Sequence, residues 1–156
     1  MPDFLFYQLT DSPLEALLPV LLEKAMGQGW RVAVQGPDAA RLAFLDERLW
    51  TYSKESFLPH SQAGGPHDAA QPVLLGPVGA AANKAEMLVL VDGGAPDMTK
   101  LDAHKRVCIV FDGNDETMLG SAREQWRAVS SAGYAAVYWA RQDGRWQQKA
   151  TSEAKA

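Results

Sequence analysis

The sequence has little cysteine and no long apolar run, and each shortage excludes a class of protein. One cysteine, Cys108, stands among 156 residues, so no internal disulfide can form and a reducing compartment is predicted. No apolar stretch approaches the roughly 20 residues that a membrane-spanning helix needs. Residues 1–4 (Met-Pro-Asp-Phe) carry none of the basic residues that begin a secretory signal. We therefore expect a cytoplasmic protein without a membrane segment.

Basic residues are also scarce. The chain has 15 Lys and Arg against 19 Asp and Glu, which gives a net charge of -4. Nonspecific binding to nucleic acid depends on many phosphate contacts by Lys and Arg. Strong direct binding to DNA is therefore not predicted, and any acidic partner would have to meet a local basic cluster.

Motifs for cofactors are missing as well. The sequence contains neither the G-x-G-x-x-G pattern of dinucleotide sites nor the G-x-x-x-x-G-K-[ST] pattern of phosphate-binding loops. The three histidines, His60, His67 and His104, are scattered without the spacing of a zinc site. We predict no cofactor, no resident metal and no catalytic residues.

Apolar patterning predicts the fold class. Short and mostly continuous apolar runs indicate strands that are covered on both faces, as in a parallel sheet between helices. These expected strands are residues 3–9, 31–35, 72–76, 87–92, 106–112 and 134–140. Apolar residues at helical spacing predict a helix from Pro13 to Gly27, with Asp11 or Ser12 as its cap, and helices over 37–50 and 115–132.

Alternating strands and helices predict a single α/β domain over residues 1–149. Its sheet is expected to be doubly wound and mostly parallel, with helices on both faces (Rossmann-like). Residues 60–71 are expected to form an exposed loop, and Asp143-Gly144 a turn. A polar C-terminal tail follows at residues 150–156.

Two aspartates follow apolar strands and raise an enzymatic alternative. Asp92 and Asp112 each stand just past a predicted strand, where carboxylates hold Mg²⁺ in hydrolases and phosphotransferases. A Mg²⁺-dependent phosphoesterase or nucleotide hydrolase using both residues is one hypothesis. The other is that Asp92 satisfies turn amides and that Asp112, Asn114 or Asp115 caps the following helix.

The helix predicted at 115–132 carries a candidate binding site. At 100° per residue, Arg123, Trp126 and Arg127 lie close together, beside the face of Ala122 and Val129 that is expected to point to the core. Arginine binds carboxylates through two hydrogen bonds, and an indole packs on aromatic rings. This trio suits an acidic peptide with an aromatic end. The alternative is a solvated basic face with Trp126 half-buried for packing.

A second candidate surface surrounds the end of the helix predicted at 37–50. Trp50 ends that helix and Phe57 follows in the next loop, and both are suited to anchor a partner protein. The alternative is that Trp50 closes the helix against the core and Phe57 fills the loop beneath it.

Two of these segments resemble the chi subunit family of bacterial DNA polymerase III. Residues 45–50 (Leu-Asp-Glu-Arg-Leu-Trp) and 56–60 (Ser-Phe-Leu-Pro-His) look like the family's Leu-Trp helix end and its Ser-Phe-x-Pro-His loop. Residues 122–127 (Ala-Arg-Glu-Gln-Trp-Arg), followed by 132–134 (Ala-Gly-Tyr), are similar to a second family pattern, and the resemblance extends over nearly the whole chain.

The resemblance implies a non-catalytic adaptor of the polymerase III holoenzyme. Such an adaptor links the clamp loader, through its psi subunit, to single-stranded DNA-binding protein during DNA replication. It implies that Arg123 binds the terminal carboxylate of that protein's acidic tail, that Trp126 lines the pocket for the tail's phenylalanine, and that Arg127 meets its aspartates. Trp50 and Phe57 would bind psi. Familiar members carry a lysine where this chain has Leu119, so one basic contact is expected to be missing.

Overall fold

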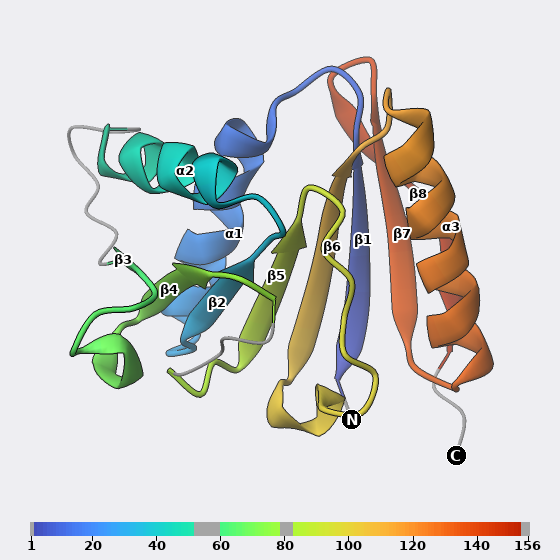
Figure 1. Cartoon of the computed structure of the whole chain (residues 1–156). Helices are drawn as coiled ribbons and strands as arrows, with labels where there is room; N and C mark the ends of the chain where they lie inside the picture. The colour runs from blue at the N-terminus through green and yellow to red at the C-terminus, as the bar shows by residue number, and fades with distance from the viewer. Residues whose placement is uncertain (1, 52–59, 79–82, 154–156) are drawn as a thin grey trace.

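The computed structural model describes residues 2–51, 60–78 and 83–153. These residues form an eight-stranded sheet with the strand order β3-β4-β2-β5-β6-β1-β7-β8, together with three α-helices (Figure 1). The strands are β1 (Asp3–Leu9), β2 (Val32–Gln35), β3 (Ser61–Gln62), β4 (Val73–Gly76), β5 (Met87–Val91), β6 (Arg106–Asp112), β7 (Ala136–Gln142) and β8 (Arg145–Ser152). The helices are α1 (Leu14–Gly27), α2 (Ala39–Thr51) and α3 (Glu116–Ser131), with short 3-10 turns at Asp68–Ala70 and Leu101–Ala103.

The sheet is mostly parallel, as predicted. Strands β1 to β7 pair in parallel with their neighbours, and only β8 runs antiparallel, against β7. The central strands β5 and β6 are buried almost throughout, which explains their continuous apolar sequence. Cys108 in β6 is fully buried, and this burial raises the pKa of its thiol to about 12.

Helices cover both faces of the sheet, which confirms the predicted α/β class. On one face, α1 and α2 bury their leucines against alternate residues of the strands, among them Val34, Val89 and Cys108. On the other face, Ala122 and Val129 of α3 pack with Phe4, Phe6 and Ile109. Figure 1 shows α1 and α2 at the β2–β4 side of the sheet and α3 at the β7–β8 side. None of the helices within the described ranges is long and apolar enough to cross a membrane.

Strand β8 is the main element that the sequence prediction missed. The expected domain ended at residue 149 with a polar tail after it, but β8 continues to Ser152 along the edge of β7. Asp143 and Gly144 form the connecting turn with φ values of 53° and 74°, and two positive φ values are typical of a two-residue hairpin. Residues 150–152 therefore belong to the sheet.

Asp11 holds this hairpin and does not cap α1. Its carboxylate accepts a hydrogen bond from the Gly144 backbone N–H at 2.8 Å and forms an ion pair with Arg141 Nε at 2.8 Å. The residue before α1 is Pro13, which makes no side-chain capping bond. The predicted Asp11 cap is therefore wrong, because a partner far along the chain takes the carboxylate.

Candidate protein-binding site

The helix α3 positions the predicted arginine and tryptophan side chains. Asp115 caps its N-terminus by accepting hydrogen bonds from the backbone N–H groups of Thr117 and Met118 at 2.9 and 3.1 Å. At the other end Gly133 adopts a φ of 86°, a left-handed conformation common after a helix. Ala122 and Val129 face the sheet. Arg123 and Arg127 are consequently exposed, four residues apart on one side of the helix.

Trp126 is half-buried and forms part of an aromatic cluster. Its ring meets Phe6 edge-on at 5.3 Å between centroids, and Tyr138 edge-on at 5.8 Å. The Tyr138 hydroxyl donates a hydrogen bond of 2.6 Å to Gln8 Oε1. These contacts come from two strands of the sheet, so they fix the orientation of the indole next to the arginines.

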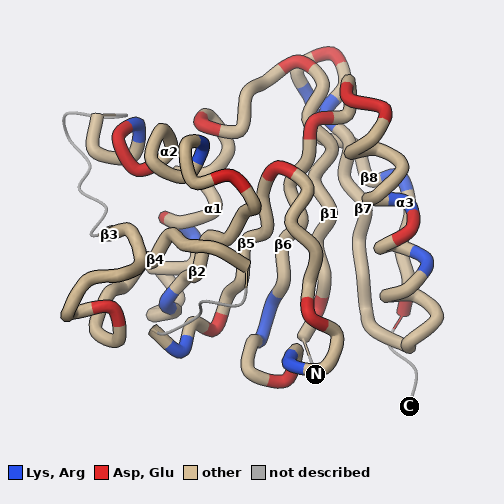
Figure 2. Tube along the Cα trace, viewed as in Figure 1, with Lys and Arg blue, Asp and Glu red and all other residues tan. Residues whose placement is uncertain are grey.

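The two arginines and Trp126 line a hollow between α3 and the β7–β8 hairpin. The hollow has a volume of about 370 Å³ and is open to solvent. We call it the basic hollow, and it is lined by Gln8, Arg123, Trp126, Arg127, Tyr138, Lys149 and Ala150. Figure 2 shows basic segments on α3 and on the neighbouring β8. The structure therefore brings Arg123, Trp126 and Arg127 together, as predicted, and adds a third basic residue.

The basic hollow has no acidic lining residue. Glu116 and Glu124, the acidic residues of α3, lie outside it. No ion pair joins Arg123, Arg127 or Lys149 to a carboxylate within the described part of the chain. Burial raises the pKa of the Tyr138 hydroxyl, and the positive charge of Arg123 nearby opposes part of that rise. The hollow is thus a local positive site in a chain of net charge -4.

Lys149 was absent from the predicted site because it belongs to the missed strand. Its Nζ donates hydrogen bonds to Gln147 Oε1 at 3.0 Å and to Gln142 Oε1 at 3.3 Å. Both acceptors are neutral amides, so the ammonium charge is positioned but not neutralised. Leu119 is partly buried against the α3-side core. A basic residue thus reaches the hollow from β8.

Trp50 lies on a different part of the surface, at the end of α2. Its side chain is 51% exposed, whereas the neighbouring Leu49 is 4% exposed and packs in the core. The Trp50 ring lies 4.2 Å from the ring of His60, which is buried and lies 3.0 Å, through Nε2, from the Asp46 backbone oxygen. The structure therefore argues against Trp50 as a core element. Phe57, the second residue of this predicted surface, lies outside the described residues.

Comparison with known proteins decides the family. The profile of the family described as DNA polymerase III chi subunit, HolC, matches residues 1–137. The chain belongs to this family. It is 31% identical over 132 residues to DNA polymerase III subunit chi of Pseudomonas aeruginosa, covering 83% of this chain and 89% of the relative. It is also 27% identical over 124 residues to DNA polymerase III subunit chi of Escherichia coli, covering 79% and 82%.

The family match covers part of the basic hollow. Arg123, Trp126 and Arg127 lie within the matched residues, and the resemblance first noted in residues 122–127 is thereby confirmed at the level of the family. Tyr138 and Lys149 lie beyond residue 137, where the match ends. The matched range therefore includes the α3 side of the hollow and ends before most of the hairpin side.

Asp92 and Asp112, the residues of the enzymatic alternative, do lie in one cleft at the carboxyl ends of the strands. The cleft has a volume of about 530 Å³. Asp92 accepts a hydrogen bond from Arg41 Nε at 3.0 Å, and Asp112 accepts one from the Asn114 backbone N–H at 2.9 Å. Within the described ranges, no group of three or more His, Cys, Asp or Glu residues could hold a metal ion. Both carboxylates make structural contacts, but Asp92 pairs with Arg41, and the cap of α3 is Asp115 and not Asp112.

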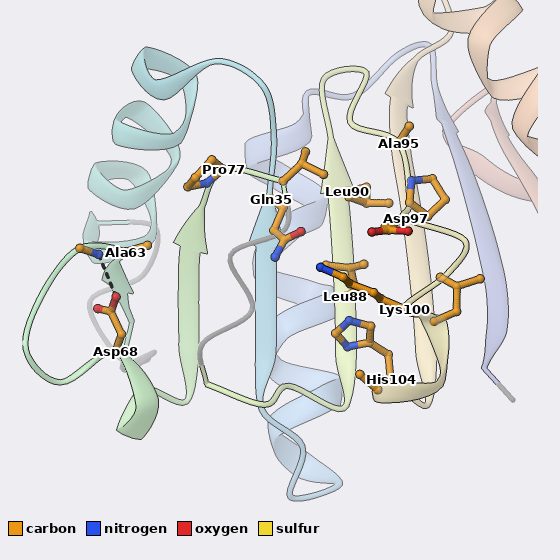
Figure 3. A pocket seen from close by; sticks show the side chains of 15 residues that line it. Gln35, Ala63, Asp68, Pro77, Leu88, Leu90, Ala95, Asp97, Lys100 and His104 are labelled. Carbon is orange, nitrogen blue, oxygen red and sulfur yellow. Dashed lines mark hydrogen bonds between the residues drawn. The ribbon is translucent and has the colours of Figure 1, made fainter.

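A further pocket of about 660 Å³ lies under the loop between β5 and β6 (Figure 3). Leu88 and Leu90 of β5 form part of its lining, and His104 and Asp97 come from the loop. His104 Nδ1 contacts the backbone oxygen of Ala85 at 2.7 Å, and hydrogen bonds from Thr99 lower the pKa of Asp97. These polar groups serve the local loop structure and form no nucleophile–base pair.

Proposed function

We propose that this chain is a non-catalytic adaptor that connects the clamp loader of DNA polymerase III to single-stranded DNA-binding protein. The basic hollow would bind the acidic C-terminal tail of that protein, and the surface around Trp50 would bind the psi subunit. The observation that carries the proposal is the combination of three basic residues, an aromatic floor and no acidic lining in one hollow. Membership of the chi family supports it. Such a role belongs in the cytoplasm, where the chromosome is replicated.

The chemistry of the hollow suits a peptide that ends in phenylalanine after acidic residues. The planar guanidinium of Arg123 can donate two parallel hydrogen bonds to a terminal carboxylate. Trp126 and Tyr138 offer ring edges and apolar surface to a phenylalanine side chain, since aromatic rings favour edge-to-face contact. Arg127 and Lys149 stand at the border of the hollow, where the preceding acidic residues of the peptide would pass. Each part of such a tail thus has a complementary group.

The proposal is tested by titrating the protein with a synthetic acidic peptide that ends in phenylalanine. We expect saturable binding, and at least about tenfold weaker binding of the same peptide without its last residue, because both the ring and the position of the terminal carboxylate are lost. Isothermal titration calorimetry at two salt concentrations measures both effects. Equal affinity for the two peptides would show that the hollow does not recognise the aromatic end.

Lys149 is expected to contribute through its charge. The Lys149→Ala variant should bind the phenylalanine-ended peptide several-fold more weakly at low salt, and the difference should shrink as salt rises, because an exposed charge is screened over about 8–10 Å near physiological ionic strength. Lys100→Ala, which removes an exposed lysine from a distant loop, is the matched control and should bind as the wild type does. If Lys149→Ala binds the peptide with unchanged affinity at low salt, β8 is not part of the binding site.

A further inference from the structure

A second apolar groove lies on the opposite face of the sheet from the basic hollow. On this face α1 packs on β6, and α2 packs on β3 and β4. The groove lies between α1 and partly buried residues of β1, β7 and β8. The groove, which we call the α1 groove, has a volume of about 480 Å³. Its floor includes Leu5, Tyr7, Val137, Trp139 and Trp146. Tyr138 lines the basic hollow and Trp139 the α1 groove, as alternation along β7 requires.

One wall of the α1 groove is formed by a side of α1 that is only partly buried. Val20 is 44% exposed although it is a large apolar residue, and Lys24 follows it one helical turn later. The buried leucines of α1 point to the core, so Val20 and Lys24 flank the groove. An apolar side chain placed beside Val20 would therefore gain buried surface on both the helix and the sheet.

The charged residues that line the α1 groove are both basic. Lys24 and Arg106 are the charged residues that line it, and no carboxylate does. Arg106 is paired with Asp3 at 3.2 Å, whereas the described ion pairs do not include Lys24. Charge complementarity therefore favours an occupant with a carboxylate near Lys24.

Arginine side chains cover two of the tryptophan rings on this face, those of Trp30 and Trp146. The guanidinium of Arg106 lies over the Trp30 ring at 5.4 Å, and that of Arg141 lies over the Trp146 ring at 5.8 Å. Tyr7 meets Trp146 edge-on at 5.5 Å. Stacking of single-stranded DNA needs open ring faces. The remaining lining, which includes Leu5, Val20, Val137 and Trp139, is apolar.

We infer that the α1 groove binds an amphipathic helix of a partner protein, with its apolar side on the groove and a carboxylate against Lys24. Val137 and Trp139 of β7 are only partly buried, and a helix lying in the groove would cover their apolar surface. The corner between α1 and the sheet is the place where a second helix would pack. α1 has 14 residues and so extends about 21 Å, which sets the length of a helix lying beside it. This binding surface is separate from the sites of the proposed function.

A synthetic amphipathic peptide tests the inference. The probe is a peptide of about 18 residues, ~27 Å long as a helix. It carries leucines at i, i+3, i+4 and i+7 on one side and glutamates along both borders. We expect it to bind the full chain, to gain helical circular dichroism on binding, and to bind at least about tenfold more weakly to Val20→Asp and to Lys24→Glu. Both residues are exposed, so unchanged thermal melting of each variant confirms its fold. A peptide with lysine in place of glutamate should bind more weakly to the wild type.

Control variants separate the α1 groove from other sites. Arg123→Ala, which alters the basic hollow, should bind the amphipathic peptide with unchanged affinity; loss of binding in this variant would place the peptide in the basic hollow and overturn the inference. Equal binding to the wild type and Val20→Asp would overturn it too, as would no binding up to about 1 mM peptide. Sedimentation equilibrium showing dimers that Val20→Asp abolishes would identify a second copy of this chain as the occupant and overturn the assignment to a partner helix.

Discussion

Replacing Arg123 with alanine is expected to weaken binding of the acidic, phenylalanine-ended peptide by about 2 kcal/mol or more, which is roughly thirtyfold in the dissociation constant. Arg123 is exposed in the free chain, and a docked peptide would cover it. In the variant, the peptide's terminal carboxylate would lose water without gaining its two guanidinium hydrogen bonds. The substitution should therefore weaken binding and leave the stability of the free protein unchanged. Calorimetry gives the dissociation constant, and thermal melting should show a fold as stable as the wild type.

Three control variants make this result specific. Arg123→Lys keeps the charge but loses the paired donors, so it should bind between the wild type and Arg123→Ala. Arg48→Ala removes an exposed arginine from α2 and should leave the affinity unchanged. Asp112→Asn should also leave it unchanged, since Asp112 lies in the cleft at the strand ends. If Arg123→Ala binds the peptide as tightly as the wild type, the basic hollow is not the site of the tail.

Sequence patterns predicted the parts of this fold whose residues are buried on both sides. The strands β5 and β6 could be located because a central parallel strand needs apolar side chains at every position, and Cys108 is buried as expected. Strand β8 could not be located in this way. It is an edge strand with mostly exposed residues, and only Trp146 and Ser152 are partly buried, so it has no apolar pattern. The Asp143-Gly144 turn was the available signal for a hairpin.

The residues of the candidate site also differ in whether the sequence could predict them. Arg123, Trp126 and Arg127 could be grouped from the sequence because helical geometry alone places them together. Gln8, Tyr138 and Lys149 come from three different strands, and their meeting depends on the order β1-β7-β8 at the edge of the sheet. The order of the strands in the sheet cannot be deduced from a single sequence. Lys149 lines the hollow because the β7–β8 hairpin brings it there.

Trp50→Ala is expected to leave the fold nearly intact and to abolish most of the binding to psi. The exposed side chain makes a ring contact with His60, and such aromatic contacts are worth about 0.5–1.5 kcal/mol. An aromatic anchor at the centre of an interface, in contrast, typically costs about 2–4 kcal/mol of binding energy when truncated, which is thirtyfold or more in the dissociation constant. Thermal melting and calorimetry with purified psi subunit measure the two effects on the same variant.

The neighbouring residue supplies the matched comparison. Leu49 is 4% exposed on the same turn of α2, so Leu49→Ala opens a cavity in the core and should cost about 2–5 kcal/mol of stability. The contrast between adjacent positions separates a role in folding from a role in binding, because the two side chains leave the same helix in different directions. If Trp50→Ala melts as early as Leu49→Ala, Trp50 acts as a core residue. If it melts like the wild type and still binds psi with full affinity, the psi surface lies elsewhere on the chain.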